Sequence, residues 1–268
     1  MELTRILAPV ALAVSTATVS VAASAGPADY TPPPPAAPPA IYEAGTVMVR
    51  VGASYVDPDD DNGKWRFNRD LYPYLDGLRY ELDSETTWNF SIGFMPVDHF
   101  SVEFIYVGES ELDLDLRGLL RPFENEKIRA GSVDRRTGEL MVNWFPVCKE
   151  SWVQPYVGLG GHYTDFDNSS FRVDANDYLA SVANAVGPAT LFLEDDWGWA
   201  AQVGVDIMFG RDSNWLVNVA VQYLDMEVAA DLHYAVPAIF DPGVSVNAAR
   251  TDIEVDPWIY NLGIGYRF

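Results

Sequence analysis

Large apolar residues alternate with small or polar residues over most of this chain after Gly45. In the segment DPWIYNLGIGYRF, at 256–268, every second residue counted back from Phe268 is aromatic or aliphatic, and most of the others are Gly, Asn or Arg. Such period-two alternation gives a β-strand one apolar and one polar face. Eight segments carry this pattern, so we predict an all-β protein with strands at 45–56, 86–95, 100–107, 137–145, 152–166, 197–209, 215–226 and 256–268.

The two faces of these strands indicate a membrane barrel. The apolar faces have aliphatic middles and aromatic ends, for example Trp88 and Phe94 in the second strand, which matches the aromatic girdles at a bilayer interface. The opposite faces hold Gly, Ser, Asn and Gln with few charges, a poor outer surface for a soluble sandwich or lipocalin-like barrel. We therefore predict an eight-stranded antiparallel transmembrane β-barrel whose apolar face contacts lipid.

The polar faces would then line the lumen, where charges must be paired or hydrated. We expect a polar network there that blocks straight-through ion flow. The same residues could equally serve only to satisfy the lumen and fix the shape of the barrel, because any narrow barrel needs such a network. The expected members are Arg50, Asn89, Glu103, Asn143, Gln202, Asp206, Asn218, Gln222, Asn261 and Arg267.

The connections between the strands alternate in length. Three are short, at 96–99, 146–151 and 210–214, and four are long, at about 57–85, 107–135, 165–196 and 225–256. Short periplasmic turns and long extracellular loops are the usual arrangement of an outer-membrane barrel.

The long connections also hold most of the acidity. They contain 30 acidic and 11 basic residues, which accounts for −19 of the net charge of −22. Binding to nucleic acid is not expected, because it depends on Lys and Arg. The acidic loops have two interpretations: solubility and mutual repulsion, or bridging of divalent cations to lipopolysaccharide phosphates.

One acidic stretch partly matches a calcium-binding loop. In DPDDDNG, Asp57, Asp59 and Asp61 fit the first, third and fifth positions. Asn62 stands where the loop requires Gly, and Asn68 where it requires Glu. We therefore predict a solvated acidic turn and no dedicated metal site, with a weak, adventitious ion site as the alternative.

One stretch of a long connection has helical periodicity. In NDYLASVANAVG, apolar residues recur at Leu179, Val182, Ala183 and Val186. Asn176 or Asp177 could cap the start of this helix and Gly187 its end. It would cover the barrel mouth, either as loop packing or as a gate.

The N-terminal region is predicted to direct export. Residues 1–25 have the features of a signal peptide with a small-residue cleavage site, and residues 26–43 form a Pro-rich periplasmic segment. The barrel is expected over 44–268. The chain has a single cysteine, Cys148, so no intrachain disulfide can form.

Several segments together resemble the OmpW family of bacterial outer-membrane proteins, which includes importers of hydrocarbons. The resemblance covers the barrel and implies an eight-stranded barrel with a narrow, largely apolar pocket that opens outward. It implies passive passage of small hydrophobic molecules, and it brings neither catalytic residues nor a cofactor. Tyr266 and Phe268 resemble the signal read by the outer-membrane assembly machinery. The matching segments are GTVMVRVG (45–52), PYVGLGGHYTDF (155–166), DDWGWAAQVGVD (195–206), NWLVNVAVQYLDM (214–226) and DPWIYNLGIGYRF (256–268).

The function expected from this sequence is a passive channel for small hydrophobic molecules. An eight-stranded barrel has room only for side chains or one small ligand, so an open aqueous pore is not expected. The apolar mouth would be lined by residues that could also simply pack the loops. These candidates are Trp65, Tyr80, Leu112, Leu114, Phe166, Leu193 and Trp197.

Two other functions are weighed against the channel. The alternative is a structural or adhesive barrel whose acidic loops bind lipopolysaccharide-bridging cations, a host surface or phage. An enzyme is not expected, because His99, His162 and His233 have no motif-spaced Ser or Asp partner. The expected partners are therefore outer-membrane lipid and lipopolysaccharide, the assembly machinery and small hydrophobic solutes.

Overall fold

The fold is that of a computed structural model, which describes residues 40–58, 79–117, 128–167, 169–170, 172–210, 212–237 and 244–268. The chain divides into two units, Met1–Ala37 and Pro38–Phe268, and the fold described here is that of the second. The predicted signal peptide, most of the Pro-rich segment and most of the calcium-like motif lie outside the described residues.

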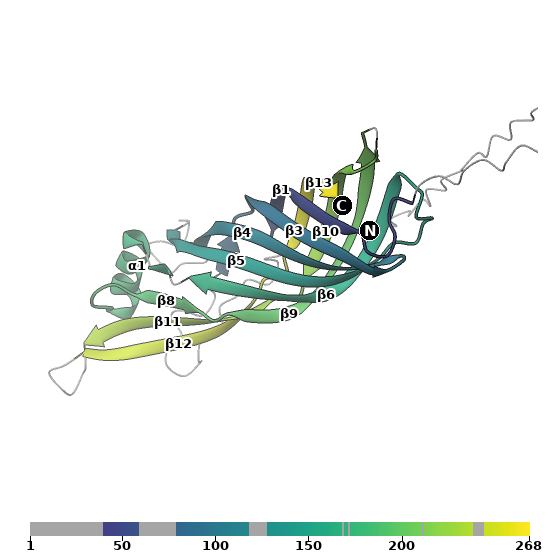
Figure 1. The fold of residues 1–268 in the computed structure, drawn as a ribbon. Coiled ribbons are helices and arrows are strands. Elements are labelled where there is room, and N and C mark those ends of the chain that lie inside the picture. The colour runs from purple at the N-terminus through teal and green to yellow at the C-terminus, as the bar shows by residue number, and fades with distance from the viewer. Residues whose placement is uncertain are drawn as a thin grey trace, which may run out of the picture. The chain divides into compact units, whose positions relative to one another are not determined.

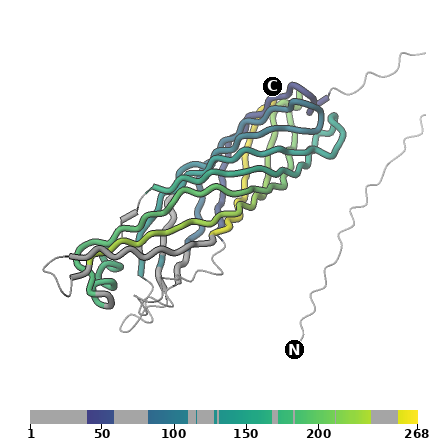
Figure 2. Tube along the Cα trace, turned by 90° about the horizontal axis from the view of Figure 1, so that it is seen from below, coloured from purple at the N-terminus to yellow at the C-terminus, as the bar shows by residue number. Residues whose placement is uncertain are grey.

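Eight of the described strands form a closed antiparallel barrel, as the alternation predicts (Figures 1 and 2). The barrel closes where its first strand pairs with its last: β1 pairs with β13 from Met48–Arg267 to Asp57–Trp258. The short strand β2 (Arg79–Leu82) is added to β4. The eight barrel strands are β1 (Val47–Asp57), β3 (Glu85–Val97), β4 (Phe100–Arg117), β5 (Ile128–Trp144), β6 (Val153–Asp167), β9 (Asp196–Phe209), β10 (Trp215–Leu224) and β13 (Trp258–Arg267).

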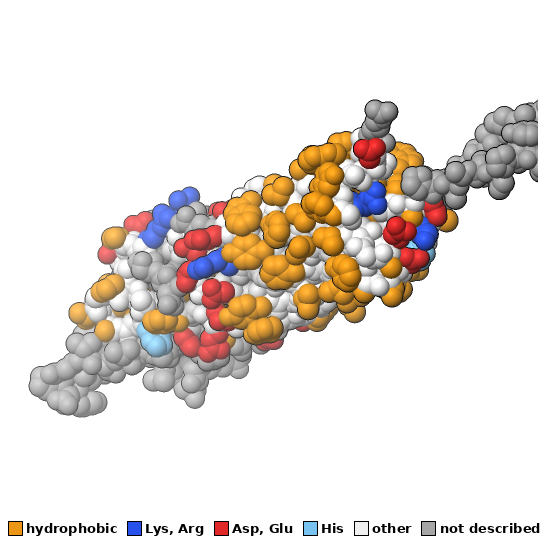
Figure 3. Space-filling model, in the orientation of Figure 1, with side chains coloured by type: hydrophobic (Ala, Val, Ile, Leu, Met, Phe, Trp, Pro, Cys, Tyr) orange, Lys and Arg blue, Asp and Glu red, His pale blue; other side chains and the backbone are white. Residues whose placement is uncertain are grey.

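The apolar face of the strands points outward. Large residues such as Trp88, Leu140 and Leu262 are exposed on the barrel wall, and the residues beside them in sequence are buried inside. The wall in Figure 3 carries hydrophobic side chains over the barrel strands, with most acidic and basic groups nearer the two ends. This distribution is the one that a lipid environment requires. None of the described helices is long and apolar enough to cross a membrane.

β4 and β5 extend well beyond the segments predicted for them, so much of the long loop expected at about 107–135 is strand. At this level of the barrel, large apolar side chains lie on the inward face and charged side chains lie on the outer face. Val133 and Phe166 point inward and are buried, whereas Asp134, Arg136 and Asp165 lie on the outer side. The sequence pattern that defined the membrane strands stops where the outer face becomes charged, which explains why the prediction ended too early.

The last long connection is also strand rather than loop. A second sheet forms beyond the barrel, at the end opposite the short turns (Figure 1). It follows the order β12–β11–β8–β7, and β11 and β12 pair along their whole length. Its strands are β7 (Ser169–Ser170), β8 (Thr190–Leu193), β11 (Glu227–Pro237) and β12 (Val244–Glu254).

The predicted helix is present but is shifted towards the N-terminus. α1 spans Val173–Ala183, its N-cap is Arg172, and the left-handed Asn184 ends it. The buried residues are Ala175, Tyr178 and Leu179, which pack into a cluster at this end of the barrel. Neither proposed N-cap is correct, because Asn176 lies inside the helix, where its side-chain amide donates to the Arg172 carbonyl.

Candidate functional site in the barrel lumen

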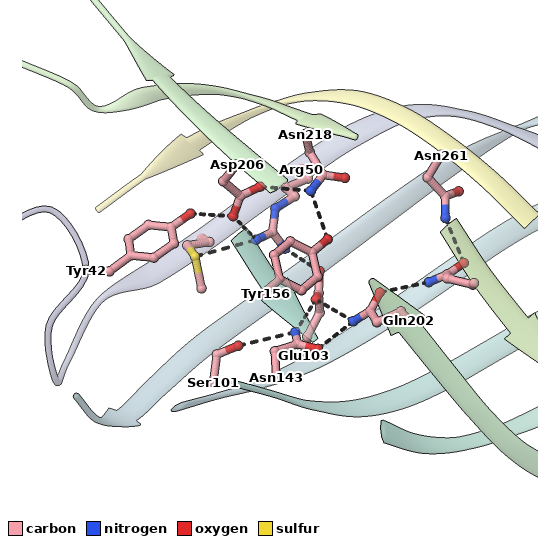
Figure 4. Close-up of polar contacts among 12 residues, drawn as sticks. Tyr42, Arg50, Ser101, Glu103, Asn143, Tyr156, Gln202, Asp206, Asn218 and Asn261 are labelled. Carbon is pink, nitrogen blue, oxygen red and sulfur yellow. Dashed lines mark hydrogen bonds and ion pairs between the residues drawn. The ribbon is translucent and has the colours of Figure 1, made fainter. Parts of the chain in front are cut away.

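A buried arginine lies between two buried carboxylates inside the barrel. Arg50 of β1 forms an ion pair with Glu103 of β4 through one guanidinium nitrogen, and its other terminal nitrogen lies 2.6 Å from Asp206 Oδ2 of β9. All three side chains are at most 4% exposed. Three strands that are far apart in sequence are therefore joined across the lumen (Figure 4). Without these partners each charge would carry a large desolvation cost.

Amide side chains extend this ion pair into one continuous network. Asn143 donates to Glu103 at 2.7 Å, and Gln202 donates to Asn143 at 2.5 Å. Further bonds run from Gln222 to Gln202 and from Asn261 to Gln222. The residues of this network, which we call the polar plug, are Arg50, Ser54, Asn89, Ser101, Glu103, Asn143, Tyr156, Gln202, Asp206, Asn218, Gln222 and Asn261.

Arg267 lies apart from the plug. Its guanidinium donates to the Ile41 carbonyl at 2.6 Å and to Asn214 Oδ1 at 2.9 Å, at the end of the barrel that holds the short turns. Nine of the ten residues predicted for the lumen network therefore belong to the plug, and Arg267 instead holds the segment that precedes β1.

Tyr42 closes the plug on the same side and was not foreseen. Its hydroxyl donates to Asp206 Oδ2 at 2.6 Å, and its ring packs edge-on against Phe145 at 5.0 Å between centroids. The side chain is 1% exposed. The backbone amides of Ile41 and Tyr42 both donate to the Lys149 carbonyl, which fixes the segment in place. A single aromatic residue ahead of the first strand leaves no periodic signal, so alternation could not reveal it.

Two glycines leave the space that the plug occupies. A Cβ at Gly158 would collide with Asn143 Oδ1 and with the Gln202 side chain. A Cβ at Gly204 would lie 2.5 Å from the Tyr156 ring. Glycine at these inward positions therefore allows the amides and the tyrosine to meet at the centre of the lumen.

The space left within the plug is small. A cavity of about 20 Å³ lies beside Arg50 and is lined by Glu103, Tyr156, Gln202 and other plug residues. This volume corresponds to about one water molecule.

Beyond the plug, on the side away from the short turns, a group of inward residues is apolar, although Thr137, Glu139, His162 and Thr164 are also buried there. We call this group the upper cluster, and it includes the buried part of α1 and of β11. Its barrel members are Val56, Ile105, Val107, Ile128, Val133, Met141, Phe166, Ala200, Leu224 and Ile259.

The residues predicted to line the mouth lie in different surroundings. Phe166 is a buried member of the upper cluster, and Leu193 of β8 packs against it. Trp197 does not line the mouth: it is 77% exposed, and its ring packs at 45° against that of Tyr163 on the outer wall, because the alternation of β9 turns it outward. Trp65 lies outside the described residues. Tyr80, Leu112 and Leu114 lie on paired strands, and their side chains are outside the described part of the chain.

The two residues of the expected assembly signal lie at the barrel seam. Tyr266 contacts the Trp215 ring edge-on at 5.1 Å, and its ring also meets Phe268. Phe268 is 72% exposed, while its backbone amide donates to the Val47 carbonyl at 2.9 Å.

Comparison with known proteins identifies close counterparts of this barrel. A model of the OmpW family matches residues 43–268. Outer membrane protein W of Escherichia coli strain K12 is 28% identical over 233 residues, which cover 85% of this chain and 90% of that protein. The relative from Salmonella typhimurium strain LT2 is also 28% identical, over 232 residues with the same coverage.

Solved structures agree in fold. The crystal structure of the outer membrane protein OprG from Pseudomonas aeruginosa has a TM-score of 0.68 and 27% identity, covering 85% of this chain and 97% of that chain. The solid-state NMR structure of AlkL in lipid bilayers has a TM-score of 0.55 and covers 90% of this chain and 96% of that chain. Its identity of 21% supports likeness of fold alone.

Proposed function

Because the chain belongs to the OmpW family and forms an outer-membrane β-barrel, we propose that it is a passive channel for small hydrophobic molecules. The short turns face the periplasm, and the second sheet and α1 face outward. Lipopolysaccharide is a polar, ordered layer, so an apolar solute gains from a protein path across it.

The upper cluster carries this proposal. Inward side chains of several barrel strands are apolar at the outward end, although the same strands present Asn, Gln and charged groups further down. A barrel that only needed to satisfy its interior could continue the polar network to the rim. An apolar lining at the outer end instead offers a hydrophobic solute a favourable surface.

The polar plug makes the path unsuitable for ions. Arg50, Glu103 and Asp206 are held by one another and by amides, and the remaining cavity is about 20 Å³. An ion passing straight through would have to displace this network and leave buried charges unpaired. We infer that solutes leave the upper part of the barrel without crossing an open aqueous pore.

Solute uptake tests the proposal directly. Cells or vesicles that carry the protein should take up a short alkane faster than those with an empty vector, and the rate of glucose entry should be unchanged. Equal alkane uptake with and without the protein would contradict the channel and favour a structural or adhesive barrel.

A further inference from the structure

Arg135 of β5 is a buried cation that has no hydrogen-bond partner among the described residues. The side chain is 1% exposed, and none of its three guanidinium nitrogens hydrogen-bonds to any group in the part of the chain that the structure describes. Arg50, in contrast, holds two carboxylates in the plug. The two arginines that are buried among the described barrel residues therefore differ: Arg50 is paired with carboxylates and Arg135 is not.

The surroundings of Arg135 are largely apolar. In the strand register it lies directly opposite Phe166 of β6, and Val133 is the next inward residue of its own strand. Both neighbours belong to the upper cluster, together with Tyr178 and Leu179 of α1. Arg135 thus places a positive charge within the apolar part of the barrel that the proposed solute path uses.

Two carboxylates, Glu85 and Glu139, act electrostatically on Arg135, but neither forms an ion pair with it. Glu139 lies four residues along the same strand, so its Cα is roughly 13 Å away at about 3.3 Å per residue. Thr137 lies between them on the inward face and contacts Thr164 at 3.1 Å. Glu139 is itself 1% exposed, and neither of its carboxylate oxygens has a hydrogen-bond partner.

We propose that Arg135 binds the carboxylate of a small apolar acid that enters the upper part of the barrel. This inference rests on the proposed function and narrows its substrate class. A guanidinium offers a planar pair of donors that matches a carboxylate, and the contact is strongest where water is excluded. The apolar body of the acid would lie against Phe166 and its neighbours.

Binding of charged and neutral probes of the same shape tests the site. The full chain in phosphatidylcholine nanodiscs is titrated with para-(trifluoromethyl)benzoate and para-(trifluoromethyl)benzamide, and fluorine NMR reports binding against empty nanodiscs. We expect the unchanged protein to bind the benzoate about tenfold more tightly than the benzamide, as one charge-assisted contact allows.

Two variants assign this preference to a residue. Arg135→Gln should abolish it. Arg136→Gln is the matched control, because Arg136 is the next residue of the strand but points outward, where it pairs with Asp167; its preference should match that of the unchanged protein. The heat-dependent shift on electrophoresis shows which variants are folded.

The outcomes separate this site from the proposed function. Equal affinity of the unchanged protein for benzoate and benzamide would overturn the Arg135 site, and so would an undiminished preference in folded Arg135→Gln. Benzotrifluoride, which has no acid group, tests the apolar path alone and should bind the unchanged protein and Arg135→Gln equally. Benzoate preference without any benzotrifluoride binding would keep the Arg135 site and contradict the apolar path.

Discussion

Tyr42, which precedes the first barrel strand, donates a hydrogen bond of 2.6 Å to Asp206 on β9, 164 residues later in the chain. The same carboxylate accepts from Arg50 and from Asn218, so the N-terminal segment is tied into the centre of the polar plug. The periplasmic end of the barrel is therefore closed by this hydrogen-bond network as well as by the barrel wall.

Substitution of Tyr42 should separate its ring packing from its hydrogen bond. Tyr42→Phe keeps the ring against Phe145 and loses one bond to a carboxylate, which lowers the free energy of unfolding by about 1.5–3 kcal/mol. Tyr42→Ala also removes the buried ring and should cost about 3 kcal/mol or more. Hydrogen exchange at the Ile41 amide should become fast in Tyr42→Ala only. Equal exchange in both variants would show that the ring does not hold the segment.

Removal of Arg50 should destabilise the barrel strongly. Arg50→Met leaves Glu103 and Asp206 buried without their cation, which costs about 3–5 kcal/mol. Neutralising both acids in the triple variant Arg50→Met, Glu103→Gln, Asp206→Asn should restore much of this loss. The urea midpoint of the refolded protein measures the effect. A single variant as stable as the unchanged protein would show that the ion pairs contribute little.

One aspartate should make the stability of the periplasmic turn depend on pH. Asp98 accepts the backbone amide of Ala44 at 2.8 Å, and this bond lowers the pKa of its carboxyl, with a smaller effect from Lys149. A carboxyl whose pKa is lower in the folded than in the unfolded state stabilises the fold. This stabilisation is fully present above the unfolded-state pKa and is lost as the pH falls through the folded-state pKa. Carboxyl NMR should therefore show Asp98 titrating below an ordinary aspartate. In Lys149→Met most of the shift should remain, whereas its disappearance would assign the shift to the lysine.

The sequence predicts the membrane part of this fold well for a physical reason. Lipid outside and a narrow lumen inside impose opposite demands on alternate residues, so the strand faces and the plug members such as Asn143 and Gln202 follow from a period of two. The same reasoning fails beyond the membrane. There Arg135 and Val133 continue the inward face while the outer face turns charged, and the stretch resembles a loop.

Two further residues show what alternation cannot provide. Trp197 is an aromatic residue of the kind expected at an apolar mouth, but the alternation of side chains along β9 places it on the outer side of the barrel. Tyr42 lies outside any strand, and only tertiary contacts bring it to Asp206. A single sequence records which face a strand residue occupies, whereas the partner of an isolated residue depends on the closed barrel.

The space for the plug depends on Gly158, and a methyl group there should disturb the network without altering the outer wall. In Gly158→Ala the new Cβ would collide with Asn143 Oδ1, so the Gln202–Asn143 bond must break or the strands must shift. Overpacking of this kind typically costs about 1–3 kcal/mol. Gly161→Ala is the matched control on the same strand, because Gly161 points outward and its nearest atom would be 3.4 Å away. We expect Gly158→Ala alone to lower the urea midpoint and to shift the side-chain amide NMR signals of Asn143 and Gln202. If Gly161→Ala had the same effect, the loss would reflect alanine in β6 and not the plug.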